Sequence, residues 1–325
     1  MIRAALPAAA LLWGLTGCAA SPPLAEGLPA GFPRSIELAG TPFFAQDEYQ
    51  CGPAALATVL RESGVITSPQ DLRPQVYVPG RRGSLQAELI GASRRHGRLP
   101  YVLAAHAGDL VAELSEGRPV LVLQNLGATR LPRWHYAVLI GYDADRNVAI
   151  LRSGTSERVE LRWQKFARTW HLGGRWAITT LAPGVMPGHA EPARFIEAAA
   201  GLEAAGRRAE AGAAYDAAIA RWPHEPLAWL GRGNVAYGDG ELDAAAEAYL
   251  RAIGLAPTNA AARNNLAQVL AAANCLPEAR RQLERAAEFG AGTELAAAVA
   301  ESRAKIEALP EPRAACALAN PALPD

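Results

Sequence analysis

The stretch at 46–53, Gln-Asp-Glu-Tyr-Gln-Cys-Gly-Pro, carries the side chains with the clearest chemical potential in this sequence. Cys51 is followed by Gly52, Pro53 and an apolar run with helical spacing, which predicts a helix that starts at the cysteine. Unpaired N–H groups at a helix N-terminus and the helix dipole favour an anion, so we expect a lowered thiol pKa and a thiolate nucleophile. Gln46 can offer its side-chain amide, with the Cys51 backbone N–H, to an oxyanion on an attacked carbonyl. The alternative is a buried, inert cysteine at a helix end.

A histidine opens the second informative stretch. His135 heads an apolar run that ends in Gly-Tyr-Asp at 141–143, and this run predicts a strand. From the start of a strand, an imidazole can reach across a cleft and act as general base and acid. Three other histidines are more simply surface residues (His96, His189 and His224), and two in loops stay minor candidates (His106 and His171).

Together the two stretches resemble the papain-like cysteine peptidases of the bacteriocin-processing (double-glycine leader) family, over about residues 38–182. The resemblance implies a papain-like α+β fold with Gln46 as oxyanion donor, Cys51 as nucleophile and His135 as general base and acid. It implies a peptide or protein substrate and neither a metal nor an organic cofactor. Relatives often sit inside exporters, but this sequence has no G-x-x-x-x-G-K-[ST] phosphate loop, so we do not carry the double-glycine specificity over.

The third catalytic position departs from that family, which has an Asp, usually followed by Pro, after the histidine strand. Here residues 150–154 read Ile-Leu-Arg-Ser-Gly. A hairpin with its turn near 144–145 brings this strand back opposite His135, so Ser153 is best placed to orient the ring by accepting from Nδ1–H. Glu157 is a possible acid slightly further along. A hydroxyl adds no negative charge to stabilise an imidazolium, so we expect weaker catalysis, with a binding-only domain as the alternative.

The elements that must position these residues lie between residues 41 and 181. Helices are expected at 51–64 and at 84–96, the second with Ser84 as its capping residue. Short apolar or alternating runs then predict strands at 118–123, 135–142, 147–151, 158–163 and 176–181. Helices followed by an antiparallel sheet give an α+β order.

A second domain follows the Pro- and Gly-containing stretch 182–191. There the sequence becomes Ala-rich and helical with a period of 34, as in the pairs Tyr215/Tyr249 and Pro223/Pro257. This period and spacing resemble the tetratricopeptide repeat, which predicts an all-α solenoid whose surface binds a protein partner. An unrelated Ala-rich bundle is the alternative.

The N-terminus predicts the compartment. Arg3 precedes an apolar run at 4–14 that is too short to span a bilayer, as in a signal peptide. Leu-Thr-Gly-Cys at 15–18 resembles a bacterial lipobox, which implies lipidation of Cys18, and Ala19 favours the outer membrane. We therefore expect a lipid-anchored protein on the periplasmic face of the outer membrane of a bacterial cell envelope, held to the membrane by its lipid alone. An ordinary secretory signal is the alternative.

Composition sets further bounds. Lys+Arg 32 and Asp+Glu 32 balance, which argues against a nucleic-acid partner. The four cysteines contain no CxxC pair to suggest zinc, and Cys275 and Cys316 either form a disulfide or stay idle. The predicted division is a signal peptide (1–17), a tether (18–37), the papain-like domain (38–182), a linker (183–191), three repeats (192–293), a capping helix (294–309) and a flexible tail (310–325).

These observations predict a lipid-anchored periplasmic cysteine peptidase that hydrolyses peptide bonds through a Cys–His pair, with repeats that recruit its substrate or partner. A catalytically weak or inactive papain-like and tetratricopeptide lipoprotein for binding and assembly is the first alternative. Acyl transfer from the same thiol to an amine stays open, because it would use the same nucleophile and base.

Overall fold

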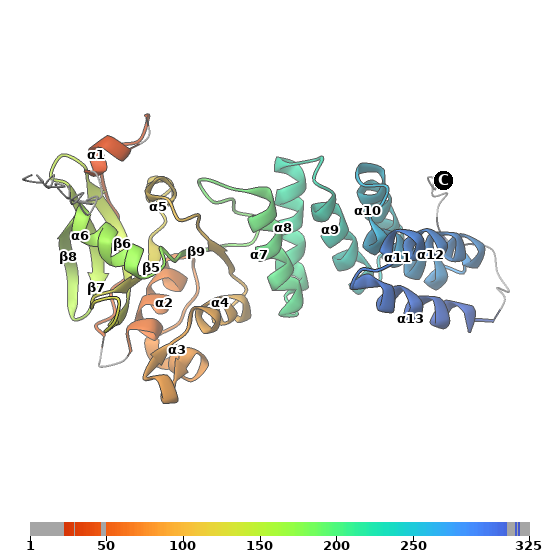
Figure 1. Cartoon of the computed structure of the whole chain (residues 1–325), viewed down its shortest axis with the longest axis horizontal. Coiled ribbons are helices and arrows are strands. Elements are labelled where there is room, and N and C mark those ends of the chain that lie inside the picture. Colours follow the sequence, from red (N-terminus) through yellow and green to blue (C-terminus); the bar gives the residue numbers. More distant parts are fainter. Residues whose placement is uncertain (1–22, 29, 47–49, 311–315, 317, 319–325) are drawn as a thin grey trace, which may run out of the picture.

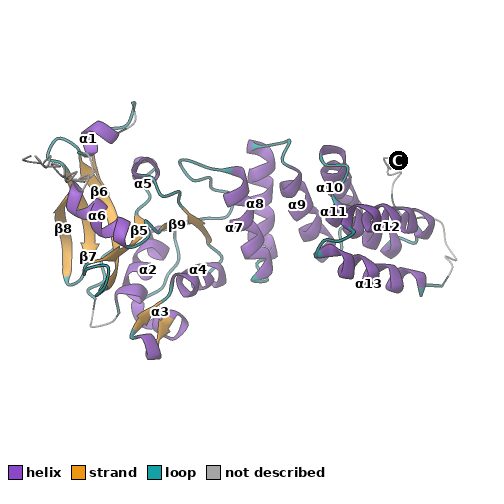
Figure 2. Cartoon of the chain, in the orientation of Figure 1, coloured by secondary structure: helices purple, strands orange, loops and turns teal. Residues whose placement is uncertain are grey.

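The computed structural model describes residues 23–28, 30–46, 50–310, 316 and 318. Within these ranges, the strands lie in the first part of the chain and a row of helices follows (Figures 1 and 2). This order agrees with an α+β domain followed by an α solenoid. The predicted signal peptide and Cys18 lie outside the described residues, as does most of the predicted tail.

An antiparallel sheet forms the framework of the first half. Its strands follow the order β4-β9-β5-β6-β7-β8, and β1 also pairs with β6. The five predicted strands are all present, and β1 and β4 join them. The bounds are β1 (Ser35–Glu37), β4 (Leu99–Val102), β5 (Val120–Asn125), β6 (Trp134–Asp143), β7 (Val148–Ser153), β8 (Ser156–Arg162) and β9 (Ala177–Leu181).

Helices cover both faces of this sheet because its central strands are apolar on both sides. In β5, Val120 and Val122 belong to one hydrophobic core, whereas Leu121 and Leu123 belong to another. Such alternation follows from the two-residue period of a strand. The second core takes α2 (Cys51–Glu62), α3 (Pro69–Val76) and α4 (Gln86–Arg95), and the first takes α5 (Ala107–Ser115) and α6 (Trp163–Leu172).

Ser84 does not cap a helix, so that prediction is wrong. It lies in the short strand β3 (Gly83–Ser84), where it pairs with Tyr77 of β2 (Tyr77–Val78). The helix α4 starts two residues later with Leu85 as N-cap and no side-chain capping bond. The single-turn 3-10 helix η1 (Pro79–Arg81) connects the two short strands. Pairing within this hairpin therefore replaces the capping role that the sequence suggested for the serine.

The segment predicted as a tether packs, in its described part, against the sheet. Leu24, in the short helix α1 (Leu24–Gly27), is only 2% exposed, and its N–H donates to Asn147 Oδ1 at 3.0 Å. Strand β1 then crosses so close to Gly141 that a Cβ there would meet the Ile36 carbonyl oxygen at 2.2 Å. Only glycine fits at this position. It allows β1 to pair with the end of β6, on the same edge of β6 along which β5 pairs with its beginning.

The linker joins the two halves firmly. Glu113 is fully buried in α5, accepts from the Gly188 N–H at 2.6 Å and pairs with Arg118 at 2.6 Å. The helix that follows the linker packs on β4, where the rings of Phe195 and Tyr101 have centroids 6.5 Å apart. One continuous hydrophobic core therefore extends from the sheet into the first helices of the repeats.

The repeat half consists of paired helices in sequence. They are α7 (Pro192–Ala204), α8 (Arg208–Arg221), α9 (Pro226–Gly238), α10 (Leu242–Leu255), α11 (Ala260–Ala272), α12 (Leu276–Gly290) and α13 (Leu295–Glu307). Buried small residues and tyrosines recur at the predicted spacing, with Tyr215 and Tyr249 each packed against a glycine of the next or same repeat. A side chain on either glycine would collide with a ring, which explains why the helices can approach so closely.

A disulfide closes the end of the described chain. Cys275, buried just before α12, is bonded to Cys316 with a Cα–Cα distance of 4.7 Å. Of the two alternatives for these cysteines, the structure therefore shows the paired one. No helix in the described ranges is long and apolar enough to cross a bilayer.

Candidate active site

A cavity of about 1220 Å³ lies where the start of α2, the start of β6 and the β7–β8 turn meet. Its lining includes Gln46, Cys51 and His135, three of the residues that the sequence predicts for catalysis. Ser153 is not part of the lining and stands behind the imidazole instead. The fold therefore assembles all four predicted residues in one place, although 107 positions separate the first from the last.

Cys51 lies at the first position of α2, as predicted. Its N-cap residue, Gln50, makes no side-chain capping bond, so the first N–H groups of the helix keep their capacity for an anion. The neighbouring Gly52 is pressed against Ser84, because a Cβ on it would meet Ser84 Oγ at 2.2 Å and Ser84 Cβ at 2.5 Å. The glycine thus allows β3 to form one wall of the cavity directly beside the thiol.

The imidazole of His135 is held by Ser153. Nε2 of the ring lies 2.8 Å from Ser153 Oγ, across the β6–β7 pair. The predicted partner is therefore found, but the ring nitrogen is Nε2 and not Nδ1, which leaves Nδ1 as the nitrogen for exchange with a thiol. Glu157 makes no contact with the ring among the described residues, and its backbone carbonyl instead accepts from Arg152 at 2.7 Å.

Gln46 fastens the loop before α2 to the strands. Its backbone N–H donates to the Gly154 carbonyl at 3.0 Å, and its side-chain oxygen accepts from the Gly154 N–H at 3.1 Å. Its amide nitrogen donates to the Tyr136 carbonyl at 3.4 Å, a long bond that occupies one of two N–H groups. The other N–H of the amide could donate to an oxyanion, as predicted. In addition, Gln46 holds the loop before α2 in position against the strands.

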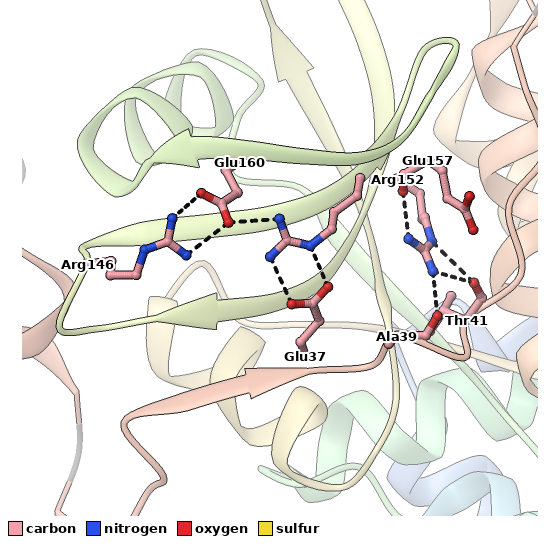
Figure 3. A network of polar contacts seen from close by, with 8 residues as sticks. Glu37, Ala39, Thr41, Arg146, Arg152, Glu157 and Glu160 are labelled. Carbon is pink, nitrogen blue, oxygen red and sulfur yellow. Dashed lines mark hydrogen bonds and ion pairs between the residues drawn. The ribbon is translucent and has the colours of Figure 1, made fainter.

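Arg152 strengthens the same junction. Its side chain is nearly buried, at 5% exposure, and donates to the carbonyls of Thr41, Ala39 and Glu157 at 2.7–3.2 Å (Figure 3). The guanidinium therefore ties the strand that carries Ser153 to the segment that leads to Gln46. This role was not predicted from the sequence, where an arginine inside an apolar run is the only signal.

A surface ion-pair network runs beside this junction. Arg158 pairs with Glu37 at 2.7 Å and with Glu160 at 2.8 Å, and Arg146 also bonds Glu160 (Figure 3). It links β1 to the β7–β8 hairpin at the surface. Because these residues are exposed or half-exposed, each pair adds little stability, and the buried Arg152 contributes more to the junction.

The charge state of the pair differs from the prediction. Burial raises the pKa of the Cys51 thiol, and backbone hydrogen bonds from Tyr136, Gly52 and Cys51 itself lower it less. Burial also lowers the pKa of His135, and the guanidinium of Arg133 lowers it further. Burial thus disfavours both the thiolate and the imidazolium, and the direction of the Cys51 pKa is opposite to the lowering predicted from the helix start. No hydrogen bond joins the sulfur to the ring among the contacts of the described residues.

The remaining histidines take no part in the cavity. His106 precedes α5 as its N-cap, and His171 lies in the last turn of α6; neither lines the cavity, although Leu172 next to His171 does. His189 of the linker contacts Asp109 at 2.9 Å instead. Nor do three or more His, Cys, Asp or Glu side chains gather into a metal-binding group anywhere in the described chain.

Comparison with known proteins divides the chain in the same way as the structure. Residues 39–178 match the peptidase C39-like family, and residues 197–260 match the tetratricopeptide repeat. No curated protein matches the chain. The two family matches lie on either side of the linker, and the first contains Gln46, Cys51, His135 and Ser153.

Solved structures similar to this chain come from both halves. A putative C39-like peptidase from Bacillus anthracis is 19% identical with a TM-score of 0.39, over 45% of this chain and 97% of that one. The peptidase domain of Streptococcus ComA, a bifunctional ABC transporter of a quorum-sensing pathway, is 22% identical with a TM-score of 0.34, over 43% and 96%. The Yersinia enterocolitica type III secretion translocator chaperone SycD is 20% identical with a TM-score of 0.33, over 35% and 82%.

Proposed function

Since residues 39–178 form a peptidase C39-like domain and tetratricopeptide repeats follow it, we propose that this chain is a cysteine peptidase that hydrolyses peptide bonds. The observation that carries the proposal is the joint placement of Cys51 and His135 in one cavity, with the ring held by Ser153 at 2.8 Å. A thiol at a helix start and an imidazole with a fixed ring are the two groups that acyl transfer needs.

The resting charges determine how the reaction would start. Because burial disfavours both the thiolate and the imidazolium, we expect His135 to take the Cys51 proton through Nδ1 as the sulfur attacks a peptide carbonyl, without an ion pair formed beforehand. The oxyanion is stabilised by the free N–H of the Gln46 amide and by the Cys51 backbone N–H. His135 then protonates the leaving amine, and a water molecule hydrolyses the acyl-enzyme. The apo side chains must close up for this step, as is common before substrate binds.

The repeats are proposed to recruit a peptide or protein partner. Repeats of this type stack into a surface that binds extended segments of other proteins. In α9 and α11, Asn234 and Asn265 form a half-buried amide pair, with Asn265 Nδ2 donating to Asn234 Oδ1 at 3.0 Å and Tyr249 OH donating to the same oxygen at 2.9 Å. Such amides suit the backbone of an extended chain.

Location is proposed from the sequence alone. We propose that Cys18 carries the lipid and that the chain works on the periplasmic face of the outer membrane. Mass spectrometry of the mature protein tests this, since a diacylglyceryl cysteine at the new N-terminus is expected. A Cys18→Ser protein should leave the membrane fraction, and its retention there would contradict the anchor.

The test of the peptidase itself is a comparison of new N-termini. Wild-type and Cys51→Ala proteins would each be mixed with an envelope proteome, with His135→Gln as the second inactive variant and Arg130→Gln as a surface control. New N-termini should appear with wild type and the control, and be absent with both site variants. Cleavage by Cys51→Ala at the wild-type rate would refute the assignment.

A binding and assembly function is the second candidate. It is favoured by the serine at the acid position, by the raised thiol pKa and by the missing bond between sulfur and ring. In that case Cys51→Ala would change no N-terminus yet would retain the same partners on affinity capture. Transfer of the acyl group to an added amine, in place of water, would show as a product mass increased by that amine.

A further inference from the structure

Arginines gather at the cavity. Arg81 at the end of η1, Arg82 next to it and Arg133 just before β6 all belong to the lining. The described residues of that lining include no Asp or Glu. Asp47 and Glu48, between Gln46 and Cys51 in the sequence, lie outside the described residues and are not counted. Because the whole chain carries no net charge, this grouping of arginines is a feature of the described part of the cavity and not of the protein at large.

Two of these arginines have no partner within the described part of the chain. Neither the Arg81 nor the Arg133 side chain forms a hydrogen bond or an ion pair with another described residue. Several other surface arginines of the same domain are paired with carboxylates, as in Arg34–Asp145, Arg146–Glu160 and Arg158–Glu37. Arg81 and Arg133 have no such carboxylate among the described residues, so their charge is available to a bound ligand.

Arg133 stands close to the reacting groups. It precedes His135 by two residues, and its charge acts on the imidazole, whose pKa it lowers. Between them Trp134 is 56% exposed and also lines the cavity, so an apolar surface adjoins the guanidinium. A ligand that meets both would carry a carboxylate beside an apolar group, which is chemistry that peptides provide.

We propose that this cavity selects peptides with a carboxylate next to the bond that is cleaved, and that Arg133, with Arg81, is the group that recognises it. The inference rests on the proposed peptidase function and names the substrate class of that same site. The carboxylate could come from an Asp or Glu side chain or from the C-terminus of the peptide, and the guanidinium would bind either one through paired N–H groups.

Internally quenched octapeptides provide the test. In one library with amidated C-termini, one position at a time is fixed as Asp or as Asn, which has the same shape without the charge. A second library repeats the Asn series with free C-termini, so the two sources of carboxylate are separated. Wild type should cleave the better Asp peptides with kcat/KM about tenfold above their Asn partners, since one charge-assisted hydrogen bond is typically of that order.

The variants localise the effect. Arg133→Gln should bring the Asp/Asn ratio close to one, because any change it makes at the His135 ring affects both peptides equally and cancels in the ratio, and Arg81→Gln should lower the ratio in part. Arg130→Gln is the matched control, because Arg130 is exposed in the same β5–β6 loop but does not line the cavity. The proposal would be overturned if the wild type preferred neither Asp over Asn nor a free over an amidated C-terminus, or if Arg133→Gln and Arg81→Gln both left the preference unchanged.

Binding to Cys51→Ala separates this proposal from the peptidase assignment. Fluorescence anisotropy of the labelled Asp and Asn peptides on that variant needs no turnover. A preference of about tenfold for the Asp peptide that Arg133→Gln removes would support carboxylate recognition even if wild type cleaved nothing. Equal affinity for both peptides would refute carboxylate recognition even if wild type cleaved both.

Discussion

The serine behind the catalytic histidine leads to the sharpest prediction. Replacing Ser153 with Asp places a carboxylate where Oγ now lies 2.8 Å from His135 Nε2. At a charge separation of about 4 Å and an effective dielectric constant of about 20, an imidazolium and a carboxylate attract each other by about 4 kcal/mol. Removing the new carboxylate from water takes back much of this gain. We therefore expect the pKa of His135 to rise by about 1 to 2 and the ion pair with the thiol to become more populated.

The measurement is the rate at which iodoacetamide alkylates Cys51 as a function of pH. In the wild type the raised thiol pKa makes this rate low at neutral pH and increasing towards alkaline pH. In Ser153→Asp the rate at pH 7 should increase about tenfold, because about 1.4 kcal/mol of added stabilisation corresponds to that factor. Titration of the His135 ring by NMR measures the change in its pKa directly.

Ser153→Asn is the matched control, because Asn has the same shape as Asp and can form hydrogen bonds but carries no charge. It should alkylate like the wild type. If Ser153→Asp and Ser153→Asn both stay within twofold of the wild-type rate while their thermal unfolding is unchanged, the orienting contact does not control the charge of the pair. Ser153 would then have no electrostatic influence on the thiol through His135.

Four further outcomes are expected. The decrease of kcat/KM on the acidic side should have its midpoint below pH 6.5, because a lowered pKa lets the His135 ring stay neutral, and act as a base, in more acidic solution. A midpoint above pH 7 contradicts this. In Gly52→Ala the new methyl group would collide with Ser84 and displace the start of α2, so alkylation of the Cys51 thiol should be lost; the added substitution Ser84→Gly should restore it. Arg152→Met should lower the free energy of unfolding in urea by about 3 kcal/mol, since three carbonyls lose the donors of one buried guanidinium; a loss under 1 kcal/mol would show that water replaces it. Phe195→Ala should lower the free energy of unfolding by about 3 to 5 kcal/mol and make both halves unfold at a lower temperature in calorimetry. An unchanged unfolding temperature of the sheet domain would argue against a shared core.

The order of elements was predictable because local signals agreed with the tertiary fold. A cysteine followed by Gly-Pro predicted the start of α2, and alternating apolar runs predicted five strands. The 34-residue period predicted the repeats. Strand β1 was missed because it has three residues and depends on a partner more than 100 positions away. Ser84 was misassigned because a serine before an apolar run indicates a cap in many helices, whereas here a hairpin uses it.

The site was predictable in its membership more than in its chemistry. Hairpin geometry alone placed Ser153 opposite His135, and the structure has that contact. The charge of the thiol was not predictable, because the helix start favours an anion while burial disfavours it, and burial depends on packing that no sequence motif encodes. For the same reason the buried role of Arg152 could not be inferred, since its three carbonyl partners come from two other segments.

The continuous core between Tyr101 and Phe195 has a mechanical consequence. Because α7 packs on β4, the first repeat has a fixed orientation relative to the sheet, and the row of repeat helices in Figure 1 extends from the sheet to one side. A polypeptide gripped by the repeats would therefore present to Cys51 only bonds at a certain contour length from the gripped part. The distance between the repeats and Cys51 would thus determine which bond is cleaved. In a peptide bound by the repeats, lengthening or shortening the segment between the bound part and the cleaved bond should shift the cleavage position.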